Sequence, residues 1–441
     1  MRTPIVHPIQ DASSMEETIV SRLTWRLVPF LFLLYIVAYL DRINVGFAAL
    51  QMQQQLGLSD AVYGLGAGIF FAGYFCFQVP SNLVLQRVGA RRWIAVLMIA
   101  WGIVSASMAL AQGKWSFYAL RFLLGSAEAG FFPGVILYLR TWFPAGARAR
   151  TVARFMTAAP LSGVVGGPLS GALLNVHRSG LAGWQCMFLL EGVPAVLLGF
   201  AAWAYLVDRP EDATWLSSEE RNWLRGTLQA ESDSRPDAHR GSHRPIDRLA
   251  AFVMPQIWIL AMIYFGLNTV SYGMSMWLPK LIQSLAGLSN FQIGVASSIP
   301  YIAAAVSMVI VGLRSDRTGE RRWHTAVPAF VGAAAMAGAA FVHSVVPAII
   351  LISFAVLGVF SMMGPFWSMP TAILSSTTAA AGIAFINSVG NLGGFFGPYI
   401  IGRLRSSTGE FRGGLLTVAA ALGVSGALAL AIRLRRSPVL D

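Results

Sequence analysis

The feature that most constrains this chain is a series of twelve apolar runs, each long enough to cross a bilayer. A membrane-spanning helix needs roughly 20 mostly apolar residues, because the hydrocarbon core is about 30 Å thick. Only 12% of the 441 residues are charged, against about 25% in soluble domains. The runs therefore predict an all-α membrane protein with spans near 26–52, 61–85, 92–111, 115–140, 150–175, 184–207, 252–284, 290–313, 323–343, 346–371, 377–402 and 412–435.

The basic residues predict which way the spans face. Of the 32 arginines and lysines, 24 fall in the two tails and in every second loop, and two, Arg42 and Arg121, lie inside spans. Cytoplasmic loops carry such an excess, so both termini are expected in the cytoplasm of a bacterial cell with the chain in its inner membrane. The net charge of +12 thus reflects orientation and does not indicate nucleic-acid binding. The alternate loops hold only six basic residues: Lys114, Arg178, Lys280, Arg403, Arg405 and Arg412.

The two halves of the chain repeat each other at a constant offset of 230 residues. The sequence GLSD at 57–60 recurs as GLSN at 287–290, and RVGARRW at 87–93 recurs as RTGERRW at 317–323. Parallel repeats of this kind are typical of transporters that alternate access around a midplane site. The expected domains are a tail over 1–25, a six-helix bundle over 26–207, a linker over 208–250, a second bundle over 251–436 and a tail over 437–441. In the linker, SSEE at 217–220 predicts a capping box that opens a surface helix.

At this point the chain resembles a known family. GLRSDRTGERR (312–322) matches the G-x-x-x-D-R-x-G-x-R-R signature of the major facilitator superfamily, while its first-half copy carries Asn82 and Gln86 in place of the glycine and aspartate. YLDRINVGFA, RFLLGSAEAGFFPGVILYL and WQCMFLLEGVP are similar to the anion:cation symporter family, which includes tartrate, phthalate and sugar-acid permeases. The resemblance implies twelve helices in two pseudo-symmetric bundles. We expect Asp316, with Arg317 and Arg321, to form a conformational gate on the cytoplasmic side.

Five ionisable residues lie well inside the predicted spans: Asp41, Arg42, Arg121, Glu128 and Glu191. Such residues usually face the bundle interior and mark ion or substrate paths. The plainer alternative is an internal salt bridge that fixes helix packing. It weighs most for Glu191, which lies near the outer end of its helix.

Helix geometry separates the roles of these residues. Neighbouring residues point about 100° apart on a helix, so Asp41 and Arg42 need partners on other helices, whereas Arg121 and Glu128 share one face. The four groups, if clustered, are neutral when ionised, so adding a carboxylate favours the arrival of a proton. Arginine offers a forked donor that matches a carboxylate, and a buried acid can take up a proton.

The resemblance assigns the same roles. It implies proton coupling by Asp41 and Glu128, and substrate binding by Arg42, Arg121 and Tyr74. The second half has no charges at the equivalent positions, and its polar residues would shape the substrate site; ordinary interhelical hydrogen bonding is the alternative for each. The candidates there are Tyr272, Ser368, Asn387 and Asn391.

The sequence therefore predicts a monomeric, proton-coupled importer of a small organic anion that needs no cofactor or metal, with lipid as its surroundings. A sodium-driven carrier or an anion exchanger on the same fold stays open as the alternative. A drug-efflux pump fits less well, because two arginines suit anions better than lipophilic cations. The absence of HExxH, P-loop and GxSxG motifs, and of a soluble domain, argues against an enzyme or a sensor.

Overall fold

The computed structural model describes residues 8–178, 180–233, 254–374 and 376–432, and within these ranges all of the regular structure is helical. The predicted tail at 437–441 and linker residues 234–250 lie outside the described residues. The first half consists of α1 (Pro8–Gln55), α2 (Asp60–Val88), α3 (Ala90–Ser107), η1 (Met108–Leu110), α4 (Lys114–Glu128), α5 (Phe131–Trp142), α6 (Ala145–Met156), α7 (Ala158–Leu173) and α8 (Gly183–Tyr205).

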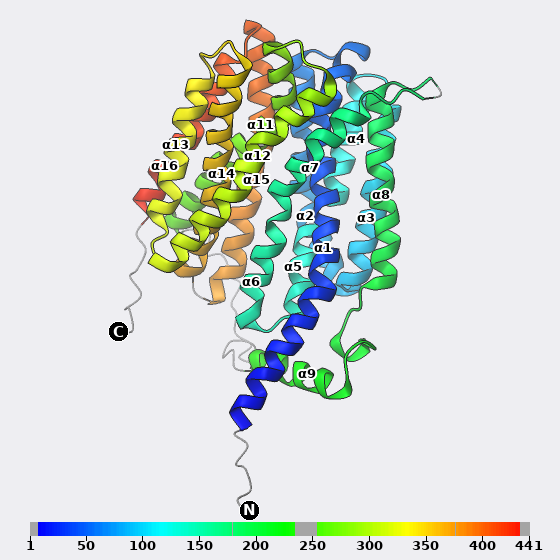
Figure 1. Ribbon diagram of the computed structural model, residues 1–441, viewed down its shortest axis with the longest axis vertical. Coiled ribbons are helices and arrows are strands. Elements are labelled where there is room, and N and C mark those ends of the chain that lie inside the picture. The colour runs from blue at the N-terminus through cyan, green and yellow to red at the C-terminus, as the bar shows by residue number, and fades with distance from the viewer. Residues whose placement is uncertain (1–7, 179, 234–253, 375, 433–441) are drawn as a thin grey trace, which may run out of the picture.

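The second half repeats the arrangement with six long helices (Figure 1). Among the described residues, nine helical segments are long and apolar enough to cross a membrane on those criteria alone. The α6–α7 pair, α13 and the more polar α15 complete the twelve crossings of the fold. The helices of this half are α11 (Pro255–Leu285), α12 (Asn290–Thr318), α13 (Arg322–Ala339), α14 (Val345–Ile373), α15 (Ser376–Thr408) and α16 (Arg412–Ala431).

Two of the predicted crossings, 115–140 and 150–175, each contain a short interruption of the helix. One crossing breaks between α4 and α5 at Ala129 and Gly130, and the other breaks between α6 and α7 at Thr157. Pro133 and Pro160 lie just after the breaks and have no N–H to donate to the carbonyl four residues earlier. In transporters, interrupted helices often border the substrate path.

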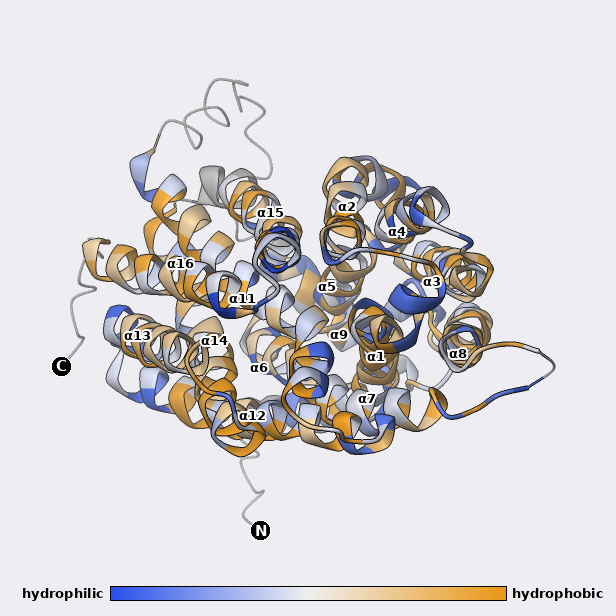
Figure 2. Ribbon diagram, turned by 90° about the horizontal axis from the view of Figure 1, so that it is seen from above, coloured by the Kyte–Doolittle hydropathy of each residue, from blue (hydrophilic) through white to orange (hydrophobic). Residues whose placement is uncertain are grey.

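The two halves meet along glycine-lined seams that follow the sequence repeat. In α7 and α12, a Cβ atom added to Gly167 would lie 2.4 Å from the carbonyl oxygen of Gly294, so main chain touches main chain. In α2 and α15, a Cβ atom added to Gly64 would lie 2.6 Å from the carbonyl oxygen of Pro398. The α1–α11 contact lies between the two seams (Figure 2). The close packing at Gly167 and Gly64 thus joins one half to the other.

The outer faces of both halves are apolar, and Figure 2 shows hydrophobic colouring around the rim of the bundle. Large side chains such as Phe200 and Ile310 are about 60% exposed, at 61% and 59%, which suits contact with lipid tails. Asp41, Arg42, Arg121, Glu128 and Glu191 are instead buried inside the bundle.

The linker carries two short helices, η2 (Pro210–Asp212) and α9 (Ser218–Asp233), at the end of the bundle where α1 begins (Figure 1). We call this the basic end, and the other the opposite end. The predicted capping box is confirmed: Ser217 N donates to Glu220 Oε2 at 2.8 Å, and Glu220 N donates to Ser217 Oγ at 3.1 Å. Glu220 also pairs with Arg22 of α1 at 2.7 Å, and Glu231 pairs with Arg148 of α6 at 3.2 Å. Helix α9 is therefore fastened to the first half.

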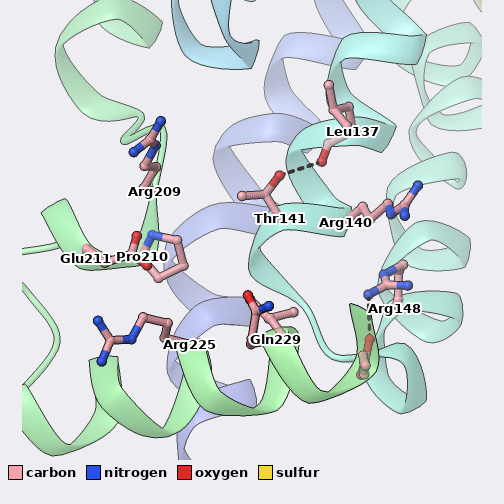
Figure 3. Close-up of a pocket in the computed structure, with 11 residues that line it drawn as sticks. Leu137, Arg140, Thr141, Arg148, Arg209, Pro210, Glu211, Arg225 and Gln229 are labelled. Carbon is pink, nitrogen blue, oxygen red and sulfur yellow. Dashed lines mark hydrogen bonds and ion pairs between the residues drawn. The ribbon is translucent and has the colours of Figure 1, made fainter. Parts of the chain in front are cut away.

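A cavity of about 520 Å³ lies between α9 and the ends of α5 and α6 (Figure 3). Its walls include Arg140, Arg148, Arg209 and Arg225, together with Glu211 and Glu231. The cavity lies at the basic end, outside the core of the bundle, and it is separate from the buried charges.

Candidate functional site

The centre of the site is a buried ion pair between α1 and the last residue of α4. Arg42 Nε donates to Glu128 Oε2 at 2.6 Å, and the two residues are 6% and 0% exposed. Glu128 is the last residue of α4, directly before the short break at Ala129 and Gly130. Among the described residues, Arg42 Nη2 and Glu128 Oε1 have no hydrogen-bond partner. Arg42 can therefore donate one further hydrogen bond, and Glu128 can accept one.

Asp41 points away from Arg42, as the helix geometry predicts, and finds neutral partners. Ser105 of α3 donates its hydroxyl to Asp41 Oδ1 at 2.7 Å, and Asn44 Nδ2 approaches the same oxygen at 3.4 Å. Asp41 is 1% exposed, and its Oδ2 has no partner among the described residues. The acid and the guanidinium thus diverge into separate environments.

Arg121 on α4 is fully buried and only partly bonded. Its Nη2 donates to the carbonyl oxygen of Ala67 at 3.1 Å, and its guanidinium carbon lies 4.9 Å from the ring centre of Phe70. Its Nε and Nη1 have no acceptor in the part of the chain that the structure describes. A buried guanidinium with two free donors is prepared to bind an anion.

Tyr74 and Tyr272 bring the two halves together around Arg42. The Arg42 guanidinium carbon lies 5.3 Å from the ring centre of Tyr74, and the phenol of Tyr272 is among its electrostatic neighbours. The Tyr272 ring centre also lies 4.4 Å from that of Phe71 on α2. Tyr272 is the repeat counterpart of Arg42, 230 residues later. The substrate residues predicted in the first half therefore lie close to Tyr272 of the second half, around the Arg42 guanidinium.

The other predicted residues of the second half are less closely joined to the charges. Asn391 is 8% exposed and lies 3.5 Å, Oδ1 to Nδ2, from Asn268, a residue that the sequence reasoning missed. Ser368 donates to the carbonyl oxygen of Gly364 in its own helix at 3.2 Å, and Asn387 is half-buried. No contact of Ser368 or Asn387 with the buried charges is recorded among the described residues, so their part in a site stays a prediction.

A second charged network, which the sequence analysis missed, joins the halves at the opposite end. Asp60 on α2 pairs with Lys280 on α11 at 2.7 Å and with Arg405 on α15 at 3.2 Å. Gln53 on α1 accepts a hydrogen bond from Lys280, and its own amide reaches Asp60 Oδ1 at 3.2 Å. With the glycine seams, this network closes the opposite end. One difference in the sequence could have pointed to this network: the first copy of the repeat has Asp60 where the second copy has the uncharged Asn290.

Two of the three residues expected at the gate, Asp316 and Arg321, form an ion pair at the basic end, and their role as a gate stays a prediction. Asp316 bonds Arg321 Nη1 at 2.6 Å within the turn between α12 and α13, whereas Arg317 is exposed. The pair lies within one half. Both ion pairs that join the halves, among the described residues, are at the opposite end.

Replacing Asp60 with asparagine should open the opposite end more often. The change leaves Lys280 and Arg405 facing each other without their shared carboxylate. Partly buried pairs are worth about 1 kcal/mol, so the ratio of open to closed molecules should rise roughly fivefold. Maleimide labelling of a cysteine at Ser275, which is buried at the α1–α11 contact, measures this opening after Cys76 and Cys186 have been changed to serine.

The matched control is Asp316→Asn, which removes a carboxylate from a pair within one half at the basic end. It should leave labelling at position 275 unchanged or lower. Equal labelling of the Asp60→Asn variant and its parent would show that the network does not hold this end closed.

Comparison with known proteins places this arrangement in a family. The family model described as Major Facilitator Superfamily matches residues 31–398 and 282–440. A putative tartrate transporter of Agrobacterium vitis is 52% identical over 427 residues, covering 97% of this chain and 93% of that protein. A quinolone resistance transporter of Acinetobacter baumannii is 41% identical, with 91% of each chain covered.

The fold also matches solved structures. A bacterial homologue of the human lysosomal transporter Spinster, in an inward-facing and unoccupied conformation, superposes with a TM-score of 0.75 and 17% identity. The match covers 94% of this chain and 96% of that one, and at this identity it concerns the fold alone. The repeated six-helix halves, the family model and the close relatives agree, and this multi-pass membrane protein belongs to the Major Facilitator Superfamily of transporters.

Proposed function

We propose that this protein imports a small organic anion together with protons, by alternating access between the two sides of the membrane. The observation that carries the proposal is Arg121, a fully buried guanidinium with two donors left without acceptors among the described residues. Burying an unpaired charge is costly, and a substrate carboxylate would complete its bonding. The similarity to a putative tartrate transporter supports a small hydroxy acid such as tartrate as the first substrate to test.

The Arg42–Glu128 pair supplies a physical route to coupling. A substrate carboxylate that binds Arg42 competes with Glu128 for the guanidinium, because their contact at 2.6 Å uses the Nε donor. A displaced buried carboxylate is unstable in the ionised form, so a proton on Glu128 favours substrate binding, and loss of that proton returns the glutamate to Arg42 and releases the anion. Proton and anion then move together.

We assign the basic end to the cytoplasm. Most of the arginines and lysines that the structure describes lie at that end, in agreement with the positive-inside rule. The network of Asp60, Lys280 and Arg405 at the opposite end then faces outward, and the conformation is one that is closed to the outside. Import begins when this network separates.

Uptake of labelled L-tartrate into proteoliposomes tests the proposal. An inward proton gradient should drive accumulation well above equilibrium, and a proton-conducting uncoupler should abolish it. Replacing sodium with potassium at fixed pH should change nothing. Uptake that follows sodium and ignores the proton gradient would instead establish the sodium-coupled alternative. Uptake that needs only an internal anion would establish exchange.

Export of a drug is the second candidate, because one close relative is named a quinolone resistance transporter. Expression of this chain in a drug-sensitive strain would then raise the inhibitory concentration of a quinolone. We expect no rise, since the buried arginines provide sites for small anions. A panel of carboxylic acids that raise the melting temperature of the purified protein would define the substrate class.

A further inference from the structure

The buried charges of the first half do not balance. Three carboxylates, Asp41, Glu128 and Glu191, face two guanidiniums, Arg42 and Arg121, and all five residues are at most 6% exposed. Arg42 is committed to Glu128, and Arg121 makes its only recorded hydrogen bond to a backbone carbonyl. Asp41 and Glu191 have no ion-pair partner among the described residues. One negative charge is therefore in excess inside a medium that tolerates it poorly.

Glu191 on α8 is buried, and a hydrogen bond from the neighbouring helix fixes its orientation. Ser170 of α7 donates its hydroxyl to Glu191 Oε1 at 2.7 Å, and Glu191 is 5% exposed. Its second oxygen, Oε2, receives no hydrogen bond from any described residue. The carboxylate is thus buried, oriented and incompletely satisfied.

Asn44 links this acid to Asp41. The Asn44 amide approaches Asp41 Oδ1 at 3.4 Å, and the same side chain lies close to the Glu191 carboxylate. Asn44 is 0% exposed, and its Oδ1 accepts no hydrogen bond from a described residue. An amide has both donors and an acceptor. Two ionised acids offer no donor to the acceptor of such an amide, and Asn44 Oδ1 is indeed unsatisfied.

Three acceptors at this place are unsatisfied, namely Asp41 Oδ2, Asn44 Oδ1 and Glu191 Oε2, against one donor, the Nε1 of Trp101 beside Asp41. One added proton supplies both the missing donor and the missing positive charge. An oxygen-liganded metal cation instead needs about six ligands when it is as hard as Ca²⁺ or Mg²⁺. Three free oxygens are too few, so the chemistry favours a proton over a metal ion.

We propose that Glu191 is a second proton-binding carboxylate, which shares one excess proton with Asp41 through Asn44. An O–H bond forms on one of the two acids, and Asn44 Oδ1 accepts from it while the Asn44 amide donates to the acid that stays ionised. The site consists of Asp41, Asn44 and Glu191, and it is distinct from the Arg42–Glu128 pair where the anion would compete. The inference rests on the proposed proton symport and adds a residue to it.

The surroundings of Glu191 offer no other charge that could take this role. Helix α8 packs on α1, α3, α7 and η1. Helix α7 and η1 contain no ionisable residue, and those of α3, Arg91 and Arg92, stand at its first turn at the basic end. Helix α1 brings Asp41 and Arg42, of which Arg42 is paired with Glu128, while Arg22 and Arg26 of α1 stand near its start at the basic end. While Glu128 is paired with Arg42, Asp41 and Glu191 are the buried carboxylates without an ion-pair partner among the described residues, and they are left to bind the excess proton.

Infrared difference spectroscopy of the substrate-free protein tests the site without transport. The wild-type protein at pH 7 should show the carbonyl stretch of a protonated carboxyl group. Glu191→Gln removes one of the two acids, so the excess charge disappears and this band should be lost. Ser170→Ala, which keeps the charge and removes only the bond to Glu191 Oε1, should retain the band. A band that is absent from the wild type, or unchanged in Glu191→Gln, would overturn the proposal.

Transport provides the second measurement. If the shared proton moves in each cycle, Glu191→Gln should carry one proton fewer per L-tartrate, measured as the pH gradient that balances a fixed tartrate gradient. Counterflow should stay within about twofold of the wild type. A purely structural role would lower uptake and counterflow together and leave the stoichiometry unchanged. If wild-type uptake ignores the proton gradient, the proposed symport fails, while the infrared result still decides whether Glu191 binds a proton.

Discussion

Replacing Glu128 with glutamine should abolish the accumulation of L-tartrate against its gradient. The carboxamide cannot bind and release a proton, so the competition between Glu128 and the substrate for Arg42 no longer depends on protons. Accumulation driven by an imposed pH gradient should fall more than about tenfold, to the level of empty liposomes, because the loss of about 1.4 kcal/mol of driving force already changes a ratio tenfold. Radiolabel uptake into proteoliposomes measures this directly.

Counterflow separates a loss of coupling from a loss of folding. Exchange of internal for external tartrate needs no net proton movement, so the Glu128→Gln variant should continue to exchange. Its glutamine is nearly isosteric and can still accept from Arg42 Nε through its carbonyl oxygen. Asp41→Asn, at the neighbouring acid bonded to Ser105, should also continue to exchange, and it should accumulate less tartrate than the wild type because the proton shared with Glu191 is lost. Wild-type accumulation in both variants would remove these acids from the coupling mechanism.

Replacing Arg121 with lysine should weaken substrate binding by roughly thirtyfold or more, although the positive charge is retained. The guanidinium donates to the Ala67 carbonyl oxygen and still presents Nε and Nη1 as a fork, while its plane lies over Phe70. An ammonium group lacks that planar fork. Truncating a buried charged contact typically costs about 2 kcal/mol or more, which corresponds to the stated change in affinity. Isothermal titration with L-tartrate gives the dissociation constant.

The control for this variant is Arg209→Lys at the exposed basic end, outside the bundle core. It changes the same chemical group and should leave the dissociation constant unaltered. Near-normal affinity in Arg121→Lys, with Arg209→Lys also normal, would show that Arg121 does not hold the anion through its fork.

The sequence predicts the parts of this molecule that depend on periodicity and on local geometry. Twelve crossings follow from hydropathy, and the divergence of Asp41 and Arg42 follows from the angle between neighbouring helix residues. The capping box at Ser217 is a contact between residues three apart, and it is confirmed. The breaks before Pro133 and Pro160 were missed, because an apolar run hides a short interruption of its hydrogen bonds.

Contacts between distant residues are the part that sequence reasoning could not supply. The ion-pair partners of Asp60 are 220 and 345 residues away, so no local pattern connects them. Glu191 looked like a helix-end residue until the structure placed it beside Asn44 and Ser170. The roles proposed for Ser368 and Asn387 depend on a substrate-bound arrangement and stay predictions.

The glycine seams have a consequence for the membrane in which this carrier works. A membrane that stores energy as an ion gradient loses it through any protein that passes ions while empty. At the seams the main chain of one half touches that of the other, as at Gly167 and Gly294. Rotation of a side chain therefore cannot open a path for ions there. Only a rigid separation of the halves parts α2 from α15 and α7 from α12. Such a barrier should keep the proton leak through the empty carrier low. The ion gradient is then spent on transport and not lost through the resting protein.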